Sequence, residues 1–271
     1  MRFVILSENR KNGICSNEDG LSIYFDIDGN KFLFDSGSSD LFIRNAKLLN
    51  INLDDIDTIV LSHGHWDHGN GLKYLNGKKI ILHPDVFVDR YSVSRNMQFA
   101  GINQKLEEML ERFEVIQTKS PYMFFKDVYY LGQIPRTIDF EGNGNISTVL
   151  DSKTEAKDYT LDDSGVVIKT KSGIVVVSGC AHSGICNTIE YAKKVAKEDT
   201  IIAVIGGFHL RKIDDVLMKT IGYFEENNVQ NIFMGHCSTD EVIKEFEKTN
   251  IKVQKLYSGA EFEIDNIPAK E

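Results

Sequence analysis

Short apolar runs and amphipathic segments alternate along the first fifty residues. Leu21–Ile27 and Lys31–Phe34 are apolar runs separated by Asp28-Gly29-Asn30, a turn sequence typical of a β-hairpin. Met1–Ser7 predicts a strand before them. Asp40–Leu49 places large apolar residues at helical spacing and predicts a packed helix. The N-terminal region is therefore expected to combine strands with a helix.

The second half of the chain alternates more regularly between the two periodicities. The apolar runs that predict strands are Gly165–Thr170, Gly173–Ser178, Thr200–Ile205 and Asn231–Met234. The amphipathic segments that predict helices are Asn187–Lys197, Asp214–Asn227 and Thr239–Lys248. Strand–helix alternation of this kind indicates a layered α/β fold.

The middle of the chain follows a less regular pattern. After a predicted strand at Lys79–His83, Gln104–Phe113 predicts a helix. An aromatic cluster follows, made of Tyr122, Phe124, Phe125, Tyr129 and Tyr130. These rings either pack the segment onto the rest of the protein, which we favour, or cover a cleft and stack on a flat ligand. We predict a single domain over residues 1–271 with an insertion or cover segment at about 86–140.

Composition narrows the class of protein. The 271 residues, 42% of them hydrophobic, can fill a substantial core. No apolar stretch approaches the roughly 20 residues that span a membrane, and the first strand is too brief for a signal peptide. The four cysteines form no dense framework, which suits a reducing compartment, so we expect a cytoplasmic protein. The net charge of −9, without a concentrated basic tract, argues against nucleic acid as a partner.

The densest chemistry lies in Leu61–Gly71, which follows a β-branched run at Ile56–Leu61. Four side chains that bind metals fall within six positions there: His63, His65, Asp67 and His68. Imidazole and carboxylate are ligands of borderline divalent metals, and a glycine-rich loop at a strand end can aim several of them into one space. The segment therefore predicts a metal site.

Two further histidines follow other predicted strands. His182 comes after the strand at Gly173–Ser178, and His236 comes after the strand at Asn231–Met234. A lone histidine is more often a packed or surface residue than a ligand. Loops at strand ends converge in layered folds, however, so we expect both histidines to join the metal site.

The string His-x-His-x-Asp-His at 63–68 resembles the signature of the metallo-β-lactamase superfamily. Further similarities follow in order along the chain, at Phe34-Asp35-Ser36-Gly37, Ser178-Gly179-Cys180-Ala181-His182-Ser183-Gly184, Gly206-Gly207-Phe208-His209-Leu210 and Met234-Gly235-His236-Cys237. The resemblance implies an α/β fold, a four-layer αβ/βα sandwich of two mixed β-sheets flanked by helices. It also implies one or two metals at an edge of the sheets.

The same resemblance implies which residues bind the metals. A first metal would be held by His63, His65 and His182, and a second by Asp67, His68 and His236. Asp35 is expected to orient a ligand histidine by accepting a hydrogen bond from its other ring nitrogen.

The chain departs from the common pattern after the strand at Thr200–Ile205. Many superfamily members carry a Gly-Asp there, and the aspartate bridges two metals, whereas this chain has Gly206-Gly207-Phe208-His209. Three side chains are candidates for the missing ligand, His209, Cys180 and Asp163, or else the site binds one metal tightly. For Cys180, a thiolate ligand and a small buried apolar residue are equally open.

Histidine-rich sites favour zinc, with iron and manganese as alternatives. Because zinc lowers the pKa of bound water to about 7, we expect a metallo-hydrolase whose metal-bound hydroxide attacks an ester- or phosphoester-like small molecule. Asp67 would accept a hydrogen bond from the nucleophile, and His209 would contact the substrate or stabilise the transition state, unless it makes a structural hydrogen bond. Three alternatives stay open: an iron redox or electron-transfer protein, a ribonuclease Z-like nuclease and a non-catalytic ligand-binding protein.

Within the superfamily, the chain resembles the group named 7,8-dihydropterin-6-methyl-4-(β-D-ribofuranosyl)aminobenzene-5′-phosphate synthase. The resemblance rests on Gly-Cys-x-His-x-Gly at 179–184, on Gly-Gly-Phe-His-Leu at 206–210 and on the segment Leu131–Arg136. It implies a pterin- or ribose-phosphate-related substrate and a synthase or transferase as a related activity. Arg136 would either pair with a phosphate or be an ordinary surface arginine.

Overall fold

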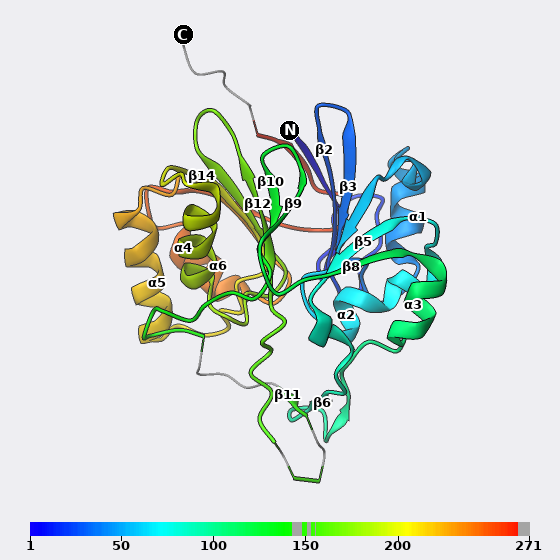
Figure 1. The fold of residues 1–271 in the computed structure, drawn as a ribbon. Coiled ribbons are helices and arrows are strands. Elements are labelled where there is room, and N and C mark those ends of the chain that lie inside the picture. Colours follow the sequence, from blue (N-terminus) through cyan, green and yellow to red (C-terminus); the bar gives the residue numbers. More distant parts are fainter. Residues whose placement is uncertain (143–147, 151–152, 155, 265–271) are drawn as a thin grey trace.

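Two seven-stranded β-sheets form the centre of the protein, and helices cover their outer faces (Figure 1). The computed structural model describes residues 1–142, 148–150, 153–154 and 156–264. The two sheets face each other, so the order across the molecule is helices, sheet, sheet, helices. This is the predicted four-layer αβ/βα sandwich.

The first sheet has the strand order β17-β1-β2-β3-β4-β5-β8. Its strands are β1 (Arg2–Ser7), β2 (Ser22–Ile27), β3 (Asn30–Phe34), β4 (Thr58–Val60), β5 (Lys79–Leu82), β8 (Glu114–Gln117) and β17 (Glu261–Glu263). Pairing is antiparallel from β17 to β3 and parallel from β3 to β8. The carboxyl ends of β3, β4 and β5 therefore meet at one edge.

The second sheet has the order β16-β15-β14-β13-β12-β10-β9. Its strands are β9 (Tyr122–Phe125), β10 (Val128–Tyr130), β12 (Gly165–Lys169), β13 (Ile174–Ser178), β14 (Ile201–Gly206), β15 (Asn231–Met234) and β16 (Lys252–Lys255). The four strands from β13 to β16 are parallel, and the others pair antiparallel. A third, small sheet has the order β11-β6-β7, from Thr148–Val149, Tyr91–Ser92 and Gln98–Phe99.

The helices lie outside the two large sheets (Figure 1). They are α1 (Leu41–Leu48), α2 (Trp66–Gly69), α3 (Leu106–Arg112), α4 (Ile185–Ala196), α5 (Asp215–Glu226) and α6 (Asp240–Phe246), and short 3₁₀ turns occupy Leu53–Asp55, Asn70–Tyr74 and Pro84–Phe87. On the first sheet, α1 packs against β1 and α3 against β8. On the second, α4 packs against β12 and β13, and α6 against β16.

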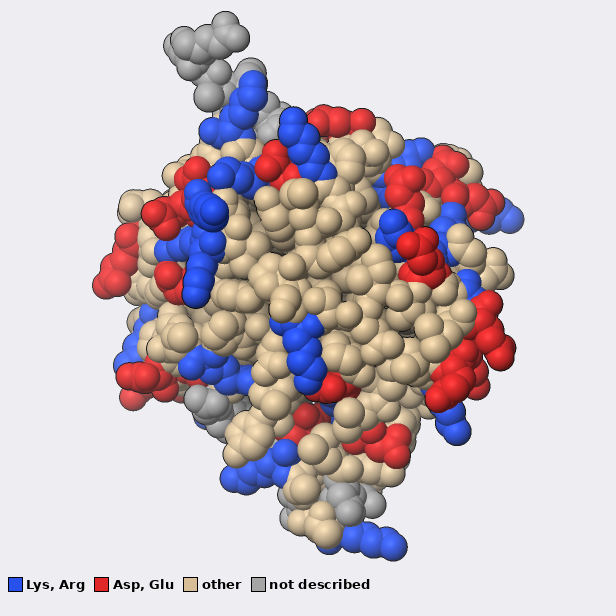
Figure 2. All heavy atoms as spheres, in the orientation of Figure 1, with Lys and Arg blue, Asp and Glu red and all other residues tan. Residues whose placement is uncertain are grey.

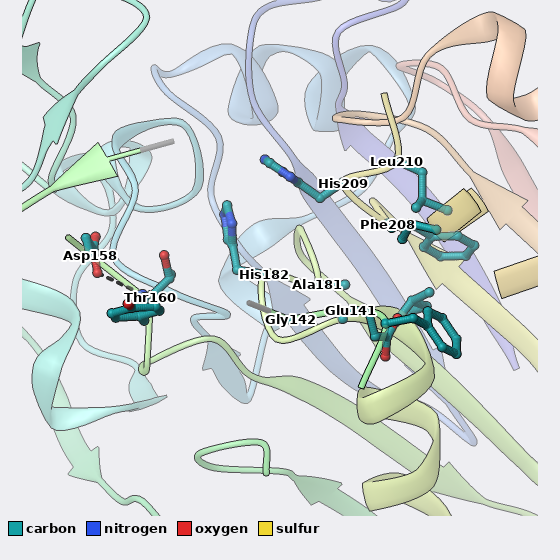
Figure 3. A pocket seen from close by; sticks show the side chains of 14 residues that line it. Glu141, Gly142, Asp158, Thr160, Ala181, His182, Phe208, His209 and Leu210 are labelled. Atoms are coloured by element: carbon teal, nitrogen blue, oxygen red, sulfur yellow. Dashed lines mark hydrogen bonds between the residues drawn. The ribbon is translucent and has the colours of Figure 1, made fainter. Parts of the chain in front are cut away.

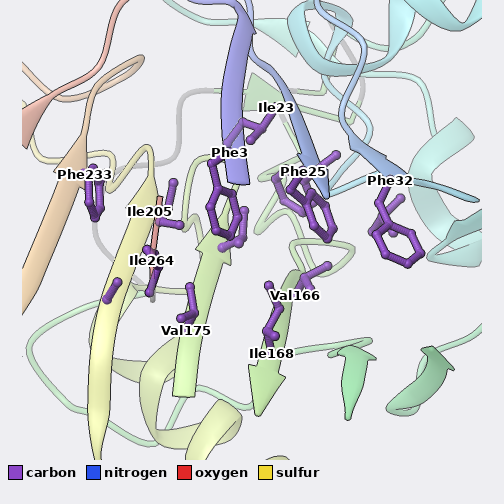
Figure 4. Packing of buried hydrophobic residues seen from close by; sticks show 14 of the residues in the cluster. Phe3, Ile23, Phe25, Phe32, Val166, Ile168, Val175, Ile205, Phe233 and Ile264 are labelled. Carbon is purple, nitrogen blue, oxygen red and sulfur yellow. The ribbon is translucent and has the colours of Figure 1, made fainter. Parts of the chain in front are cut away.

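An apolar layer fills the space between the two sheets (Figure 4). The ring of Phe25, from the first sheet, stacks on Phe3 at 5.7 Å and on Phe32 at 5.1 Å. Val166, Val175 and other aliphatic side chains of the second sheet belong to the same cluster. Because this layer joins both sheets, it fixes how their carboxyl edges are placed relative to each other.

Most of the predicted elements are confirmed. The hairpin of β2 and β3 forms around the predicted turn, and α1, α4, α5 and α6 lie within two residues of the predicted bounds. The edge strands β16 and β17 and the small sheet are additions that the pattern of apolar residues did not predict.

The segment from 86 to 140 contributes strands to both large sheets. β8 extends the first sheet, while β9 and β10 form the end of the second. The rings of Phe124 and Phe125 lie 5.4 and 5.7 Å from Phe32, against the layer between the sheets. Packing is therefore the role that the structure gives to these two aromatics, as we favoured.

Acidic and basic side chains lie together along the margins of the face in Figure 2, around a largely uncharged centre. That face presents no continuous basic surface. Within the part of the chain that the structure describes, no helix has the length and apolar character needed to cross a membrane.

Replacing Phe25 by alanine tests the layer between the sheets. Phe25 is fully buried between two other rings, so the truncation should lower the free energy of unfolding by about 3–5 kcal/mol, measured by urea denaturation. Met218→Ala, which removes an exposed side chain on α5, should change it by less than about 0.5 kcal/mol. Equal losses in the two variants would contradict this account of the core.

Candidate metal centre

The loop that follows β4 is held tightly against its neighbours. A Cβ atom at Gly64 would lie 2.0 Å from the carbonyl oxygen of Val86 and 2.2 Å from Nη1 of Arg90, so only glycine fits. The backbone N–H of Gly64 donates to Asp162 at 2.7 Å. α2, a single turn, then begins at Trp66, whose backbone N–H bonds to the carbonyl of Ala100 at 3.1 Å.

The first cluster of imidazoles is formed by residues from both sheets. The ring nitrogens of His63 and His65, from the loop after β4, and of His182, from the loop after β13, lie within 4.8 Å of one another. Nε2 of His182 is buried and has no hydrogen-bond partner in the described structure. Burial lowers the pKa of all three histidines well below the usual value, with neighbouring charged groups adding to the effect. The rings are therefore neutral and offer lone pairs.

A second cluster lies beside the first. It brings together Asp67 and His68, from α2, and His236, from the loop after β15, with ligand atoms again within 4.8 Å of one another. Nε2 of His68 is 3.0 Å from Nε2 of His236, which is 3.7 Å from Oδ2 of Asp67. The structure thus brings together all six residues that the sequence pattern predicted as metal ligands.

Hydrogen bonds outside the second cluster place the ring protons of its histidines. Nδ1 of His68 lies 2.6 Å from Oδ2 of Asp35, and Nδ1 of His236 lies 2.8 Å from Oδ1 of Asn9. Both oxygens are acceptors, so each Nδ1 carries a hydrogen and each Nε2 faces the other ring. Burial lowers the pKa of His68, but the carboxylates of Asp35 and Asp67 more than offset this and raise it to about 9. Nε2 of His68 can therefore carry a proton toward Nε2 of His236, at a position that a bound metal ion would take instead.

The first cluster is arranged in the same way. The Ser62 hydroxyl donates to Asp35 at 2.7 Å and so accepts from Nδ1 of His63 at 2.8 Å. Nε2 of His65 lies 3.4 Å from Oγ1 of Thr148, which itself donates to Asp158 at 2.9 Å. The remaining nitrogens, Nε2 of His63 and Nδ1 of His65, face each other at 2.9 Å.

These contacts provide a test of whether the residues fit a metal ion. The two unprotonated nitrogens of His63 and His65, which face each other at 2.9 Å, repel unless a cation lies near both. Between His68 and His236, the raised pKa of His68 shows in the same way that a positive charge is favoured there. Neutral imidazoles whose outer nitrogens are hydrogen-bonded are also the usual form of histidine ligands. The donor set therefore fits divalent metal ions in both clusters.

Asp35 anchors the second cluster, as its position after β3 predicted. Its carboxylate accepts hydrogen bonds from the backbone N–H and hydroxyl of Ser62 and from His68, at 2.6 to 2.7 Å. Asp35 itself has a positive φ of 59°, a conformation that non-glycine residues seldom adopt. The strained turn is what aims the carboxylate at the histidine loop.

The candidates for the missing bridging ligand lie in three different environments. Asp163 is buried and accepts a hydrogen bond from the backbone N–H of Ser183 at 2.8 Å, so it supports the loop that carries His182. It belongs to neither described cluster. The ring of His209 lies 4.6 Å from that of His182, facing the cavity (Figure 3). Only Cys180 joins the clusters, with Sγ 3.3 Å from Nε2 of His68.

Several residues that shape the site gave no local signal in the sequence. Arg90 is buried and pairs with Asp158 at 2.7 Å and with Asp162, which holds Gly64. Asn9 and Thr148 bind outer nitrogens of the histidines from segments far away in sequence. Only their position in the folded chain identifies them, because arginine, asparagine and threonine at isolated positions match no motif.

Arg136 does not lie ready to bind a phosphate. Its guanidinium donates to the carbonyl oxygen of Gly142 at 2.8 Å and to those of Tyr159 and Thr160. These bonds tie two loops together, so the structural alternative for Arg136 is the one that the contacts support.

Two cavities open beside the clusters. The larger, of about 340 Å³, is lined by ligand residues of both clusters and by Trp66, Arg95, Phe99 and Arg211. The smaller, of about 100 Å³, is lined by apolar residues such as Phe140 and Phe208 and by polar ones such as Asp158 (Figure 3). His182 and His209 line both cavities. A small molecule bound in either one would therefore lie beside the first cluster.

Comparison with known proteins yields a family and several relatives. Residues 17–82 match the metallo-beta-lactamase superfamily. The chain is 33% identical over 242 residues to the uncharacterized protein MJ0448 of Methanocaldococcus jannaschii, covering 86% of this chain and 89% of that protein. It is 31% identical over 261 residues to the 7,8-dihydropterin-6-methyl-4-(beta-D-ribofuranosyl)-aminobenzene-5'-phosphate synthase of the same organism, covering 90% of this chain and 89% of the synthase.

Among solved structures, the chain is similar to Tm1679, described as a metal-dependent hydrolase of the beta-lactamase superfamily. The TM-score is 0.83 at 28% sequence identity, and the match covers 97% of this chain and 99% of that one.

Asp35→Asn tests the support of the second cluster. The amide would no longer serve as a charged acceptor for His68, so metal affinity should fall by about 10- to 100-fold, measured by competition with a chromophoric chelator. Asp55→Asn, at an exposed carboxylate paired with Lys31, should leave the affinity unchanged. Circular dichroism would establish that both variants are folded, and wild-type affinity in a folded Asp35→Asn variant would contradict the anchoring role.

Proposed function

Because the chain belongs to the metallo-β-lactamase superfamily, we propose that it is a metal-dependent hydrolase acting on an ester- or phosphoester-like small molecule. One observation carries the proposal: two adjacent clusters from both sheets bring imidazole nitrogens face to face beside a cavity. The similarity to a structure described as a metal-dependent hydrolase supports it.

In this proposal, six residues hold two divalent metals: His63, His65 and His182 for the first, and Asp67, His68 and His236 for the second. Nitrogen and carboxylate ligands in this proportion suit zinc. When bound, such a metal supplies a Lewis acid that polarises the substrate and activates water near neutral pH. The first set has three protein ligands, the number that catalytic zinc sites usually use.

Asp67 and His209 are the residues that we propose as catalytic. Asp67 lines the larger cavity, where its carboxylate can accept a hydrogen bond from the attacking water. The ring of His209 lies between the two cavities and beside His182. There a ring N–H can donate to negative charge that develops on the substrate. Its backbone N–H bonds to Sγ of Cys237 at 3.2 Å, which fixes the loop.

The wall of the larger cavity favours an anionic, partly aromatic substrate. Arg211 lines it and makes no ion pair with any residue that the structure describes. Arg95 lies 5.2 Å above the ring of Trp66 and is 3.4 Å from the exposed carboxylate of Asp19. Two guanidinium groups in a protein of net charge −9 would attract a phosphate or carboxylate. A flat ring can pack against Trp66 or Phe99.

These features agree with a pterin- or ribose-phosphate-related substrate, which the name of the relative synthase suggests. The relevant aromatic residues are then Trp66 and Phe99, because Phe124 and Phe125 pack against the layer between the sheets.

Metal removal and His65→Ala test the reaction class. Phosphoesters, lactones and thioesters should be hydrolysed by the metal-loaded protein, and hydrolysis should fall to background after chelation and return on adding metal. In His65→Ala, added metal should not restore hydrolysis, because the first cluster loses a ligand.

A matched control uses His83, a histidine that lies outside both clusters. His83 caps the turn at Pro84–Phe87 through Nδ1, and His83→Asn keeps an acceptor there, so this variant should retain activity. Hydrolysis that survives both chelation and His65→Ala would contradict a metal-dependent mechanism.

Arg211→Ala and Arg95→Ala test the substrate's charge. Each should raise the KM for a phosphorylated substrate by about tenfold or more, since hydrogen bonds between charged groups contribute roughly 1.5–3 kcal/mol. The KM for a neutral ester should stay unchanged. Lys212→Ala, at an exposed lysine next in the chain, is the control. An equal rise for both substrates, or none, would contradict anion recognition.

A further inference from the structure

The end of β14 has no room for a side chain. A Cβ atom at Gly206 would lie 1.9 Å from the carbonyl oxygen of Ser178. A Cβ atom at Gly207 would lie 2.6 Å from the carbonyl oxygen of Gly179 and 2.7 Å from Sγ of Cys237. The loops from β13 and β15 therefore occupy the space into which a carboxylate from β14 would have to project.

Cys180 lies between the two clusters. Its sulfur is within 4.8 Å of the ligand nitrogens of His63 and His68, and in a second group it is equally close to the ligand nitrogen of His236 and to Sγ of Cys237. His63 belongs to the first set of proposed ligands, whereas His68 and His236 belong to the second. Sγ of Cys180 is 3.3 Å from Nε2 of His68. Tetrahedral zinc, with Zn–N about 2.0 Å and Zn–S about 2.3 Å, places nitrogen and sulfur ligands roughly 3.5 Å apart.

The surroundings of Cys180 differ from those of an ordinary buried cysteine. Cys186 belongs to the apolar cluster between the second sheet and its helices. Cys180 is equally buried but belongs to none of the three hydrophobic clusters, and its neighbours are imidazoles. Its loop is fixed as well, because a Cβ atom at Gly179 would lie 2.2 Å from Oγ of Ser62.

Charge gives a further reason for an anionic ligand here. Two divalent ions would bring four positive charges, and Asp67 is the one carboxylate among the described cluster residues. Closely spaced cations in a buried site need anionic ligands to offset their repulsion and the loss of hydration.

We propose that the thiolate of Cys180 is shared by the two metal ions and takes the place of the bridging carboxylate that this chain lacks. On metal binding, the S–H bond is replaced by sulfur–metal bonds and the proton leaves to solvent. The inference rests on the metal occupancy assumed in the proposed function, but not on hydrolysis or on any substrate.

Cobalt(II) provides a direct test, since cobalt–thiolate bonds give an intense charge-transfer absorption in the near ultraviolet that imidazole and carboxylate ligands do not give. The metal-free full chain is titrated with Co²⁺ and the band is recorded at each equivalent. A shared sulfur predicts a band that grows with both the first and the second equivalent. Cys180→Ser should lose the band and bind the second equivalent at least about tenfold more weakly.

Two other cysteine variants serve as controls. Cys186→Ala removes a thiol outside the clusters and should leave the band and both affinities unchanged. Cys237→Ser removes the neighbouring sulfur, which accepts from the backbone N–H of His209, and should retain the band. Circular dichroism would confirm that each variant is folded.

The other outcomes overturn the proposal. Absence of a band in the wild-type chain with bound cobalt, or a band unchanged in folded Cys180→Ser, would exclude Cys180 as a ligand. A band that grows with only one equivalent would exclude a shared thiolate. A chain that shows the expected bands but hydrolyses no test compound would contradict the proposed function and leave this inference standing.

Discussion

The site depends on holding pairs of imidazole nitrogens face to face. Nε2 of His68 and Nε2 of His236 are 3.0 Å apart, and the corresponding pair in the first cluster is 2.9 Å apart. Ring nitrogens at this distance repel unless a proton or a metal ion lies between them, so other contacts must keep the rings in place. Those contacts are acceptors behind the rings, above all the buried carboxylate of Asp35. Because a buried carboxylate needs several donors to be stable, Asp35 also binds Ser62 twice and thereby fixes the loop after β4.

The layer between the sheets makes this arrangement possible. The first sheet supplies His63, His65, Asp67 and His68, while the second supplies His182 and His236. Neither edge holds a complete set of ligands. Rings that stack across the layer, such as Phe233 of β15 on Phe262 of β17 at 3.9 Å, fix the two sheets relative to each other. A small shift between the sheets would separate the histidines. Burial in the layer thus helps to hold the ligands of the two sheets together.

The sequence was sufficient to predict those elements and ligands whose pattern lies within a short segment of the chain. Apolar periodicity predicted the hairpin of β2 and β3 and most helices, and the dense motif at 63–68 predicted the ligands that the structure brings together. It did not predict strands whose place depends on pairing with residues far away in the sequence. β16 alternates Lys252, Val253, Gln254 and Lys255, which is a weak strand signal, and its place is set by pairing with β15. Likewise, the sequence offered Asp163 and Cys180 equally as candidates for the missing ligand. Only the fold shows that Asp163 supports a loop and that Cys180 belongs to the clusters.

The absence of an aspartate at the end of β14 and the choice of metal are linked by the packing of the loops at this strand end. Gly206 and Gly207 allow the loops from β13 and β15 to approach β14 so closely that an aspartate from this strand end is excluded. The same approach places the sulfur of Cys180 beside His68. Exchanging a carboxylate oxygen for a thiolate makes the ligand set softer, which favours zinc over manganese. Sulfur also accepts weaker hydrogen bonds than oxygen, so it needs fewer donors around it, in keeping with the tight packing of glycine and backbone at this edge. A chain that restored the aspartate would have to open the space between these loops, and it would then move Cys180 away from the histidines.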